Sequence, residues 1–259
     1  MILVGDIGNT ETILGLRTED GRVIRRWRVH TDARRTADEV GILLRGLLAS
    51  APEGGAPLGA ARFASVVPPA TRAMIEGARR YLGVPAAEFR WAPELGIRLD
   101  VDEPDHVGPD RVANTLAVHL EYPGPAVVVD MGTATNFDVV SAEGVFLGGL
   151  IAPGIESGAA TLTGRTALLP RIAAGFPESL IGKTTVEHMQ IGVYRAACVL
   201  IDGLLARLRA EWEPAATAVA TGGLAALVGE RCEGIDVIDP DLTLKGVGWG
   251  HDRLSPPTA

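Results

Sequence analysis

The sequence uses one short pattern twice, and this repeat constrains the fold more than any other feature. Residues 1–10 read MILVGDIGNT, and residues 126–135 read AVVVDMGTAT. In each stretch an apolar strand ends in an aspartate, a glycine follows two residues later, and threonine hydroxyls come next. The two aspartates, Asp6 and Asp130, lie 124 residues apart in a chain of 259 residues. The chain is therefore predicted to contain the same structural unit twice.

The surrounding hydrophobic patterns predict the elements of each unit. Strands are expected over 2–8, 12–18 and 23–30 in the first half, and over 126–132, 136–141 and 145–154 in the second. Helices are expected over 36–50, 71–83, 108–122, from about 155 and over about 184–212, with further strands at 61–67, 217–221 and 235–239 and a loop at 52–57. The first helix carries a capping box, Thr36 with Glu39. This order predicts an α/β protein of two β-β-β-α-β-α units with mixed sheets.

Composition narrows the functional class. Hydrophobic residues make up 47% and charged residues 22% of the chain, which is typical of a globular protein. A net charge of −8 disfavours a nucleic-acid partner, since binding phosphates needs clustered Lys and Arg. The apolar runs are too short to span a membrane, and no basic segment precedes an apolar one, so we expect a cytoplasmic protein. Cys198 and Cys232 lie far apart in sequence, which favours reduced thiols over a disulfide.

The repeated hairpin suits phosphate binding. Its tip presents backbone amides, and glycine lets the backbone approach a phosphate closely. The aspartate that ends the strand can hold a cation over the same phosphates, through water where the ion is Mg²⁺. One such turn alone is compatible with a simple tight hairpin. Two copies facing each other across a cleft, with a third glycine-rich turn at Gly222 and Gly223, favour a nucleotide site.

A second phosphate-binding pattern is rejected. Residues 182–185 read GKTT, but a P-loop requires a glycine five positions before Gly182, and Pro177 stands there. The same residues are interpreted as the beginning of the following helix, where amides and hydroxyls can receive an anionic group.

Asp110 is the candidate base. It lies in the first turn of the helix predicted over 108–122, where a carboxylate is favourable for the helix dipole without any function. In a kinase it would orient a substrate hydroxyl, and we expect the dipole to keep it ionised with a low pKa. Phosphoryl transfer requires positioning more than a strong base, so a low pKa is no objection. Arg111 is compatible with binding a carboxylate or phosphate and with ordinary surface charge.

With these residues in place, the chain resembles the type III pantothenate kinases, within the acetate and sugar kinase/Hsp70/actin superfamily. The resemblance runs through the chain in order: DIGNT with Gly15, SVVPP, VGPDR, DMGTATNFD, GGLIAPGI, LLP, IGKTT, TGGLA and DLTLKGV. It implies a duplicated ribonuclease H-like fold with halves at 1–115 and 116–259 facing a central cleft. It also implies transfer of the γ-phosphate of ATP to the 4′-hydroxyl of pantothenate, the first step of coenzyme A biosynthesis. Mg²⁺, a monovalent cation (K⁺ or NH₄⁺) and a homodimer are implied as well.

The same resemblance assigns the site residues. The first phosphate loop comprises Asp6, Ile7, Gly8, Asn9, Thr10, Glu11, Thr12 and Ile13, with Asp6 near Mg²⁺. Thr133 lies in the second phosphate loop, the turn at Gly222 and Gly223 serves adenosine, and Asp130 binds the monovalent cation. Asp110 is the base. Pantothenate contacts are assigned to Gly108, Pro109, Asp110, Arg111 and Thr185, the last from either subunit.

Two positions depart from the family pattern. The tyrosine that usually helps line the pantothenate site is replaced by Val101, and the usual Ser-Gly after the helix start at GKTT is Ile191-Gly192. Two other functions stay open at this stage. One is a non-catalytic transcription accessory factor, since the family includes proteins first described in that way, and the other is a superfamily kinase with a different small substrate.

Overall fold

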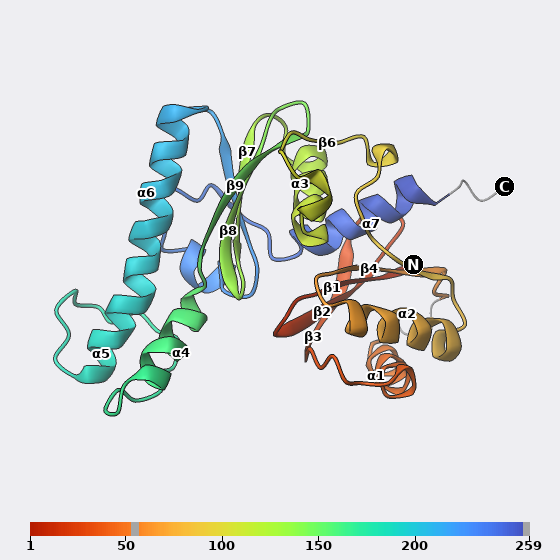
Figure 1. The fold of residues 1–259 in the computed structure, drawn as a ribbon, viewed down its shortest axis with the longest axis horizontal. Helices are drawn as coiled ribbons and strands as arrows, with labels where there is room; N and C mark the ends of the chain where they lie inside the picture. The colour runs from red at the N-terminus through yellow and green to blue at the C-terminus, as the bar shows by residue number, and fades with distance from the viewer. Residues whose placement is uncertain (53–56, 256–259) are drawn as a thin grey trace. The chain divides into compact units, whose positions relative to one another are not determined.

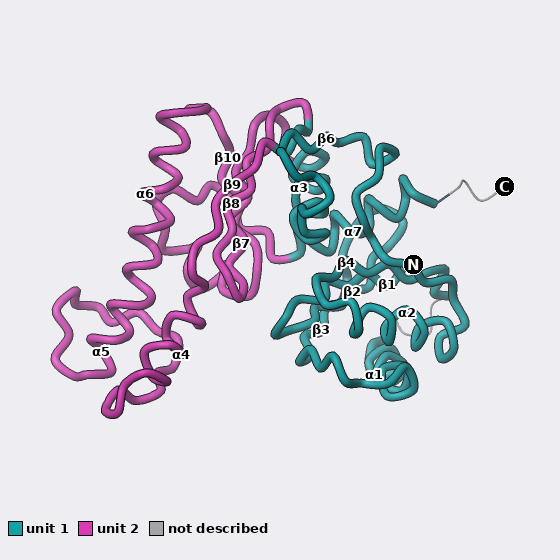
Figure 2. Tube along the Cα trace, viewed as in Figure 1, with its two compact units in different colours: residues 1–121, 144–146, 241–259 teal, residues 122–143, 147–240 magenta. Residues whose placement is uncertain are grey.

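The structure is a computed structural model that describes residues 1–52 and 57–255; positions 53–56 of the predicted loop at 52–57 lie outside the described residues. The chain divides into two compact units (Figure 2). Unit 1 comprises residues 1–121, 144–146 and 241–259, and unit 2 comprises residues 122–143 and 147–240. Each unit is described separately below.

Unit 1 contains a five-stranded mixed sheet in the order β3-β2-β1-β4-β5. The strands are β1 (Ile2–Ile7), β2 (Glu11–Arg17), β3 (Val23–His30), β4 (Ala60–Ser65) and β5 (Ala86–Glu88). β1, β2 and β3 form antiparallel pairs, whereas β4 is parallel to β1 and β5 is parallel to β4. The carboxyl ends of β1 and β4 therefore lie at the same edge, and the register pairs Asp6 with Ala64.

Helices cover both faces of this sheet (Figure 1). α1 (Ala37–Ala49) and α2 (Pro68–Leu82) pack with Leu3, whereas α3 (Pro109–Glu121) and α7 (Leu242–Leu254) pack with Val4. Neighbouring residues of a strand point to opposite faces, so β1 contributes to both cores. The predicted capping box of α1 is present, with the Thr36 side chain accepting from the Glu39 amide.

The sheet that carries the second hairpin is also mixed, in the order β11-β10-β7-β8-β9-β6. Its strands are β7 (Ala126–Met131), β8 (Ala134–Val140), β9 (Val145–Pro153), β10 (Thr217–Thr221), β11 (Val237–Ile238) and the edge strand β6 (Arg98–Leu99). β7 is antiparallel to β8 and parallel to β10, in the same way as β1 relates to β2 and β4. The predicted duplication of a mixed sheet is confirmed.

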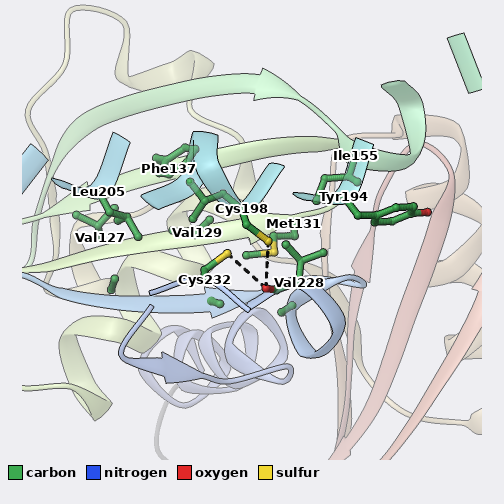
Figure 3. Packing of buried hydrophobic residues seen from close by; sticks show 14 of the residues in the cluster. Val127, Val129, Met131, Phe137, Ile155, Tyr194, Cys198, Leu205, Val228 and Cys232 are labelled. Carbon is green, nitrogen blue, oxygen red and sulfur yellow. Dashed lines mark hydrogen bonds between the residues drawn. The ribbon is translucent and has the colours of Figure 1, made fainter. Parts of the chain in front are cut away.

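One core of unit 2 packs around β7 (Figure 3). The helices are α4 (Ile155–Arg165), α5 (Thr185–Gln190) and α6 (Ala196–Glu211), with a π-helical turn, Ile191–Arg195, between the last two. Cys198 and Cys232 are buried, unpaired thiols that both donate to the carbonyl oxygen of Val228, as Figure 3 shows. Burial raises the pKa of both thiols, which disfavours the reactive thiolate form.

The two copies of the hairpin differ in one respect. β1 and β7 have the same length and the same alternation of burial, with the aspartate half-buried in each. Three residues separate β1 from β2, however, and only Gly132 and Thr133 separate β7 from β8. The Gly8 amide closes the first turn by donating to the Glu11 carbonyl, and the Gly132 amide closes the second turn by donating to the Ala134 carbonyl.

Several elements were absent from the sequence interpretation. They are β5, β6, α7, the 3₁₀ turns Pro93–Leu95 and Pro104–His106, and the π-helical turn Ala225–Gly229. The helix predicted over about 184–212 is present but divided by the π-helical turn. Within the described parts of the chain, no helix is long and apolar enough to cross a membrane.

Candidate active site

The first hairpin places its predicted residues in two different environments. Asp6 is half-buried at the end of β1, and Gly8, Asn9 and Thr10 form the turn. Ile7 is fully buried in the core with α1 and α2, and the buried hydroxyl of Thr12 shares a 2.8 Å hydrogen bond with that of Thr31. The Ile7 side chain is therefore structural, and any contact of Ile7 with a ligand is limited to its backbone.

The remaining residues of this hairpin are accessible. The side chains of Asn9, Thr10 and Glu11 are exposed, and Ile13 is half-buried. The exposed turn suits backbone and hydroxyl contacts to phosphate oxygens.

The second hairpin is held against the beginning of α4. Thr133, at its tip, is exposed, and its carbonyl accepts a 2.8 Å hydrogen bond from the Ser157 hydroxyl. A side chain at Gly154, the residue before α4, would overlap the same Thr133 carbonyl. Ser157 was missed by the sequence interpretation, although the GGLIAPGI stretch just before it was noted.

Asp130 and the third glycine-rich turn lie together in unit 2. β7 and β10 are parallel, and their register pairs Asp130 with Thr221. Gly222 follows Thr221 with a φ of +92°, and a Cβ on it would lie 2.5 Å from Asp130 Oδ1 and 2.7 Å from the Met131 amide nitrogen. The structure therefore brings Asp130 and Gly222 into direct contact, at the carboxyl ends of parallel strands where ligands of α/β proteins bind.

Asp110 lies in the first turn of α3, as predicted. Gly108, Pro109, Asp110 and Arg111 are all half-buried there. Burial raises the pKa of the Asp110 carboxyl above its ordinary value, and the amide and guanidinium of Arg111 oppose this rise. The expectation of a low pKa from the helix dipole is wrong, because desolvation outweighs the favourable amide contacts. A carboxylate with a raised pKa is a better proton acceptor.

Arg111 contacts an aromatic ring that the sequence interpretation missed. Its guanidinium carbon lies 5.0 Å from the centre of the Phe146 ring. The two residues are 35 positions apart, so no local pattern indicates the pair. Val101 is half-buried shortly after β6, in the same unit as Arg111.

Thr185 is the first residue of α5 in unit 2 and is exposed. Thr184, the residue before it, caps the helix by accepting from the Glu187 amide. The interpretation of residues 182–185 as a helix beginning is therefore confirmed, and no P-loop strand precedes it.

The acidic residues fit cations that are held mainly by a nucleotide. No group of three or more His, Cys, Asp or Glu side chains that could hold a metal ion is found among residues 1–52 and 57–255. Asp6 and Asp130 each end a strand beside an exposed, glycine-containing turn. A single carboxylate suffices for Mg²⁺ when waters and phosphate oxygens supply the other ligands.

Solved structures with the same fold are distant in sequence. A Campylobacter jejuni protein described as a Baf family transcriptional activator gives a TM-score of 0.56 at 18% identity, with 96% of this chain and 97% of that chain covered. The Clostridium difficile activator of 2-hydroxyisocaproyl-CoA dehydratase, with bound ADPNP, gives 0.51 at 12% identity, with 100% and 99% covered. With the two mixed sheets of this chain, these similarities confirm a duplicated ribonuclease H-like fold.

Sequence comparison gives the family. The family described as type III pantothenate kinase matches residues 2–207. The type III pantothenate kinase of Rhizorhabdus wittichii is 44% identical over 257 residues, covering 98% of each chain. That of Parafrankia sp. is 45% identical over 258 residues, covering 99% of this chain and all of the relative. The chain therefore belongs to the type III pantothenate kinase family.

Proposed function

We propose that this protein transfers the γ-phosphate of ATP to the 4′-hydroxyl of pantothenate, in the first step of coenzyme A biosynthesis. The family membership supports the reaction. The observation that supports the catalytic assignment is Asp110, a half-buried carboxylate with a raised pKa at the beginning of α3.

Asp110 acts as the base of this proposal. Its carboxylate accepts a hydrogen bond from the 4′-hydroxyl, which points the hydroxyl oxygen at the γ-phosphorus, and takes the proton as the new P–O bond forms. Phosphoryl transfer passes through a loose transition state, so this orientation contributes more than proton abstraction itself. The raised pKa makes proton transfer to Asp110 more favourable than to an ordinary aspartate.

The other pantothenate contacts are assigned to the residues around Asp110. Arg111 binds the carboxylate of pantothenate, because a guanidinium binds a carboxylate through two parallel hydrogen bonds. Gly108 and Pro109 shape the wall beside it, and Thr185 supplies a hydroxyl. Val101 replaces the family tyrosine with a smaller apolar contact.

The ATP contacts are assigned to the three glycine-containing turns. In Asp6 to Ile13, the turn amides and the hydroxyl of the exposed Thr10 are assigned to phosphate oxygens. Thr133 is assigned to the phosphates, and the turn at Gly222 and Gly223 is assigned to adenosine. Asp6 would hold Mg²⁺ through water, and the bound ion would supply positive charge beside the phosphates; Asp130 would hold K⁺ or NH₄⁺.

Purified protein tests the assignment of Asp110 directly. With ATP and pantothenate, coupled ADP release should be fast for wild type and reduced at least about 100-fold for Asp110→Asn. Asp105→Asn is the matched control, because Asp105 is exposed five residues earlier in the chain. Full activity of Asp110→Asn would contradict the assignment of the base. The wild-type protein could also turn over pantothenate slowly and another alcohol faster in a substrate screen. That result would favour the alternative in which the enzyme is a superfamily kinase with a different small substrate.

The cation assignment has its own test. Replacing K⁺ and NH₄⁺ by Na⁺ should cut the rate of wild type sharply. Asp130→Asn should be equally slow in all three salts, whereas Asp105→Asn should respond to them as wild type does. An unchanged cation response in Asp130→Asn would rule out Asp130 as the ligand.

We also propose a homodimer. Apolar side chains are exposed on α4, α5 and α6 and on the segment between α4 and α5, where a second copy would cover them; they are Leu162, Leu168, Leu180, Ile181, Val186, Val199 and Leu200. Val199→Asp should yield a monomer by light scattering. Ile42→Asp, at a comparably exposed position on α1 in unit 1, should leave the dimer intact.

The source of Thr185 can be tested by mixing subunits. If Thr185 reaches the partner's pantothenate, a mixture of Asp110→Asn and Thr185→Ala chains should recover activity that neither variant has alone, because some dimers then contain one complete site.

The remaining proposals concern organisation and location. We propose that the chain consists of two halves divided near residue 115, that it is located in the cytoplasm, and that it binds neither nucleic acid nor a membrane.

A further inference from the structure

Phe146 is in direct contact with the guanidinium of Arg111. The Arg111 guanidinium carbon lies 5.0 Å from the centre of the Phe146 ring, within the range of a cation–π interaction. The Phe146 side chain is 1% exposed, whereas Arg111 is half-buried. Cation–π attraction is stronger where water is excluded, so this ring is a strong restraint on the orientation of the arginine.

The backbone of Phe146 is also fixed. Phe146 is the second residue of β9, and the parallel pairing with β6 puts Leu99 opposite it. The Asp100 amide donates a 2.9 Å hydrogen bond to the Phe146 carbonyl. Val101 follows Asp100 in the chain. The segment in which Val101 replaces the family tyrosine is therefore hydrogen-bonded to β9, the strand that contains Phe146.

The arginine is restrained from its own helix as well. Its carbonyl accepts a 2.8 Å hydrogen bond from the Thr115 hydroxyl, one turn later in α3. The ring contact disfavours rotamers of Arg111 that would carry the guanidinium away from Phe146. A side chain that is ordered before binding loses less entropy when it binds a carboxylate.

We propose that Phe146 is a positioning residue that sets pantothenate affinity through Arg111. This inference rests on the proposed function, in which Arg111 binds the pantothenate carboxylate. Phe146 is too deeply buried to touch the substrate, so its whole effect passes through the arginine. Phe146 thus supplies an aromatic contact to Arg111 in this chain.

The expected kinetic effect is on KM. The carboxylate end of pantothenate does not react, so the Arg111 contact is made equally in the ground state and the transition state. Loss of such uniform binding raises KM and leaves kcat unchanged. Phe146→Leu should raise the KM for pantothenate about 5- to 30-fold, corresponding to the strength of a partly buried cation–π interaction, with no change in the KM for ATP.

Two further variants separate this effect from a loss of packing. Phe146→Tyr keeps the aromatic face and should retain a near wild-type KM. Phe137→Leu truncates a fully buried phenylalanine on β8 in unit 2 and should leave the KM for pantothenate unchanged. Phe146→Met, whose unbranched and flexible side chain fills irregular space better, replaces Phe146→Leu if the leucine variant melts below the assay temperature.

A double-mutant cycle gives the decisive measurement. In an Arg111→Gln background, Phe146→Leu should change the KM for pantothenate less than two-fold, because the residue through which it acts is gone. A full effect of Phe146→Leu in that background, or an unchanged KM in the single variant, would overturn the inference. Failure of the proposed function is distinguishable, since wild-type protein would then not phosphorylate pantothenate.

Discussion

Gly222 packs closely against Asp130 and Met131, and replacing Gly222 with alanine tests whether this packing fixes the position of Asp130. An L-residue at a φ of +92° is strained by about 1–2 kcal/mol. The new Cβ would lie 2.5 Å from Asp130 Oδ1 and 2.7 Å and 2.8 Å from the amide nitrogen and carbonyl carbon of Met131. Two of these three atoms belong to the backbone of a central strand, so relief requires movement of β7 or β10.

The expected loss of stability follows from these two effects. Overpacking of a rigid site costs about 1–3 kcal/mol, so Gly222→Ala should destabilise by about 2–5 kcal/mol in total. For a chain of this size, each kcal/mol corresponds to about 2–4 °C, so the Tm should fall by about 4–20 °C.

Gly83→Ala is the control for backbone strain alone. Gly83 ends α2 with a φ of +68°, and no atom lies within 4 Å of a Cβ built on it. Its variant should lose only about 2–8 °C, and its response to K⁺ should stay that of wild type.

Two measurements on purified protein decide the outcome. Scanning calorimetry gives the Tm of each variant, and a K⁺ titration of ADP release gives the cation response. Gly222→Ala should require more K⁺ for half-maximal activity, because Asp130 must shift away from the new methyl group. Equal melting temperatures for the two variants, with equal K⁺ responses, would refute the idea that Gly222 fixes Asp130.

Three more predictions concern Asp110, Arg111 and Gly154. Burial raises the pKa of Asp110 in the folded state, so ionised Asp110 destabilises the fold at pH values above its unfolded pKa of about 3.9. Asp110→Asn removes this charge and should therefore raise the Tm at pH 8. In melting curves, the gain in Tm should become smaller as the pH falls toward 4. Arg111 lowers this pKa, so Arg111→Gln should move the acidic limb of the kcat profile to higher pH, and an unmoved limb would contradict the assignment. Gly154→Ala should displace the Thr133 carbonyl and raise the KM for ATP. Gly158→Ala is the control, because Gly158 lies within α4 and no atom lies within 4 Å of a Cβ built on it. Calorimetry should show that this control raises the free energy of unfolding by about 0.5–1 kcal/mol.

Most of the fold was predictable because local and periodic signals agree with it. The strand–Asp–turn pattern placed β1 and β7, and the capping box at Thr36 placed the beginning of α1. These signals depend only on residues a few positions apart.

α7 was not predicted because the local helix propensity of its sequence is low. Gly246, Gly248 and Gly250 lower helix propensity, so the stretch is typical of a loop. Side chains at these positions would overlap Ala113, Arg17 and Phe89 respectively. The glycines let α7 approach α3 and β2 closely, and contacts from distant parts of the chain then stabilise a helix that local preference disfavours.

The sequence patterns placed the candidate site residues on their elements but did not indicate the surroundings of their side chains. The dipole argument for Asp110 considered only neighbours in its own helix, whereas burial by the rest of the unit determines the direction of its pKa shift. The contact between Arg111 and Phe146 joins two elements far apart in sequence, so neither residue indicates the other.

The two copies of the hairpin have the same arrangement of strands and differ in the residues that contact their turns. Asp6 and Asp130 occupy the same position in strands of identical burial, each with a parallel partner strand. The shorter second turn is fixed by Ser157, and Gly222 lies against Asp130. Of the two carboxylates, Asp130 is therefore the one with a tightly packed glycine turn against it. The surroundings of the two carboxylates therefore differ although their strands match, which is compatible with different cations at the two positions. The assignment of the monovalent ion to Asp130 and of Mg²⁺ to Asp6 stays the proposal that the family resemblance implies.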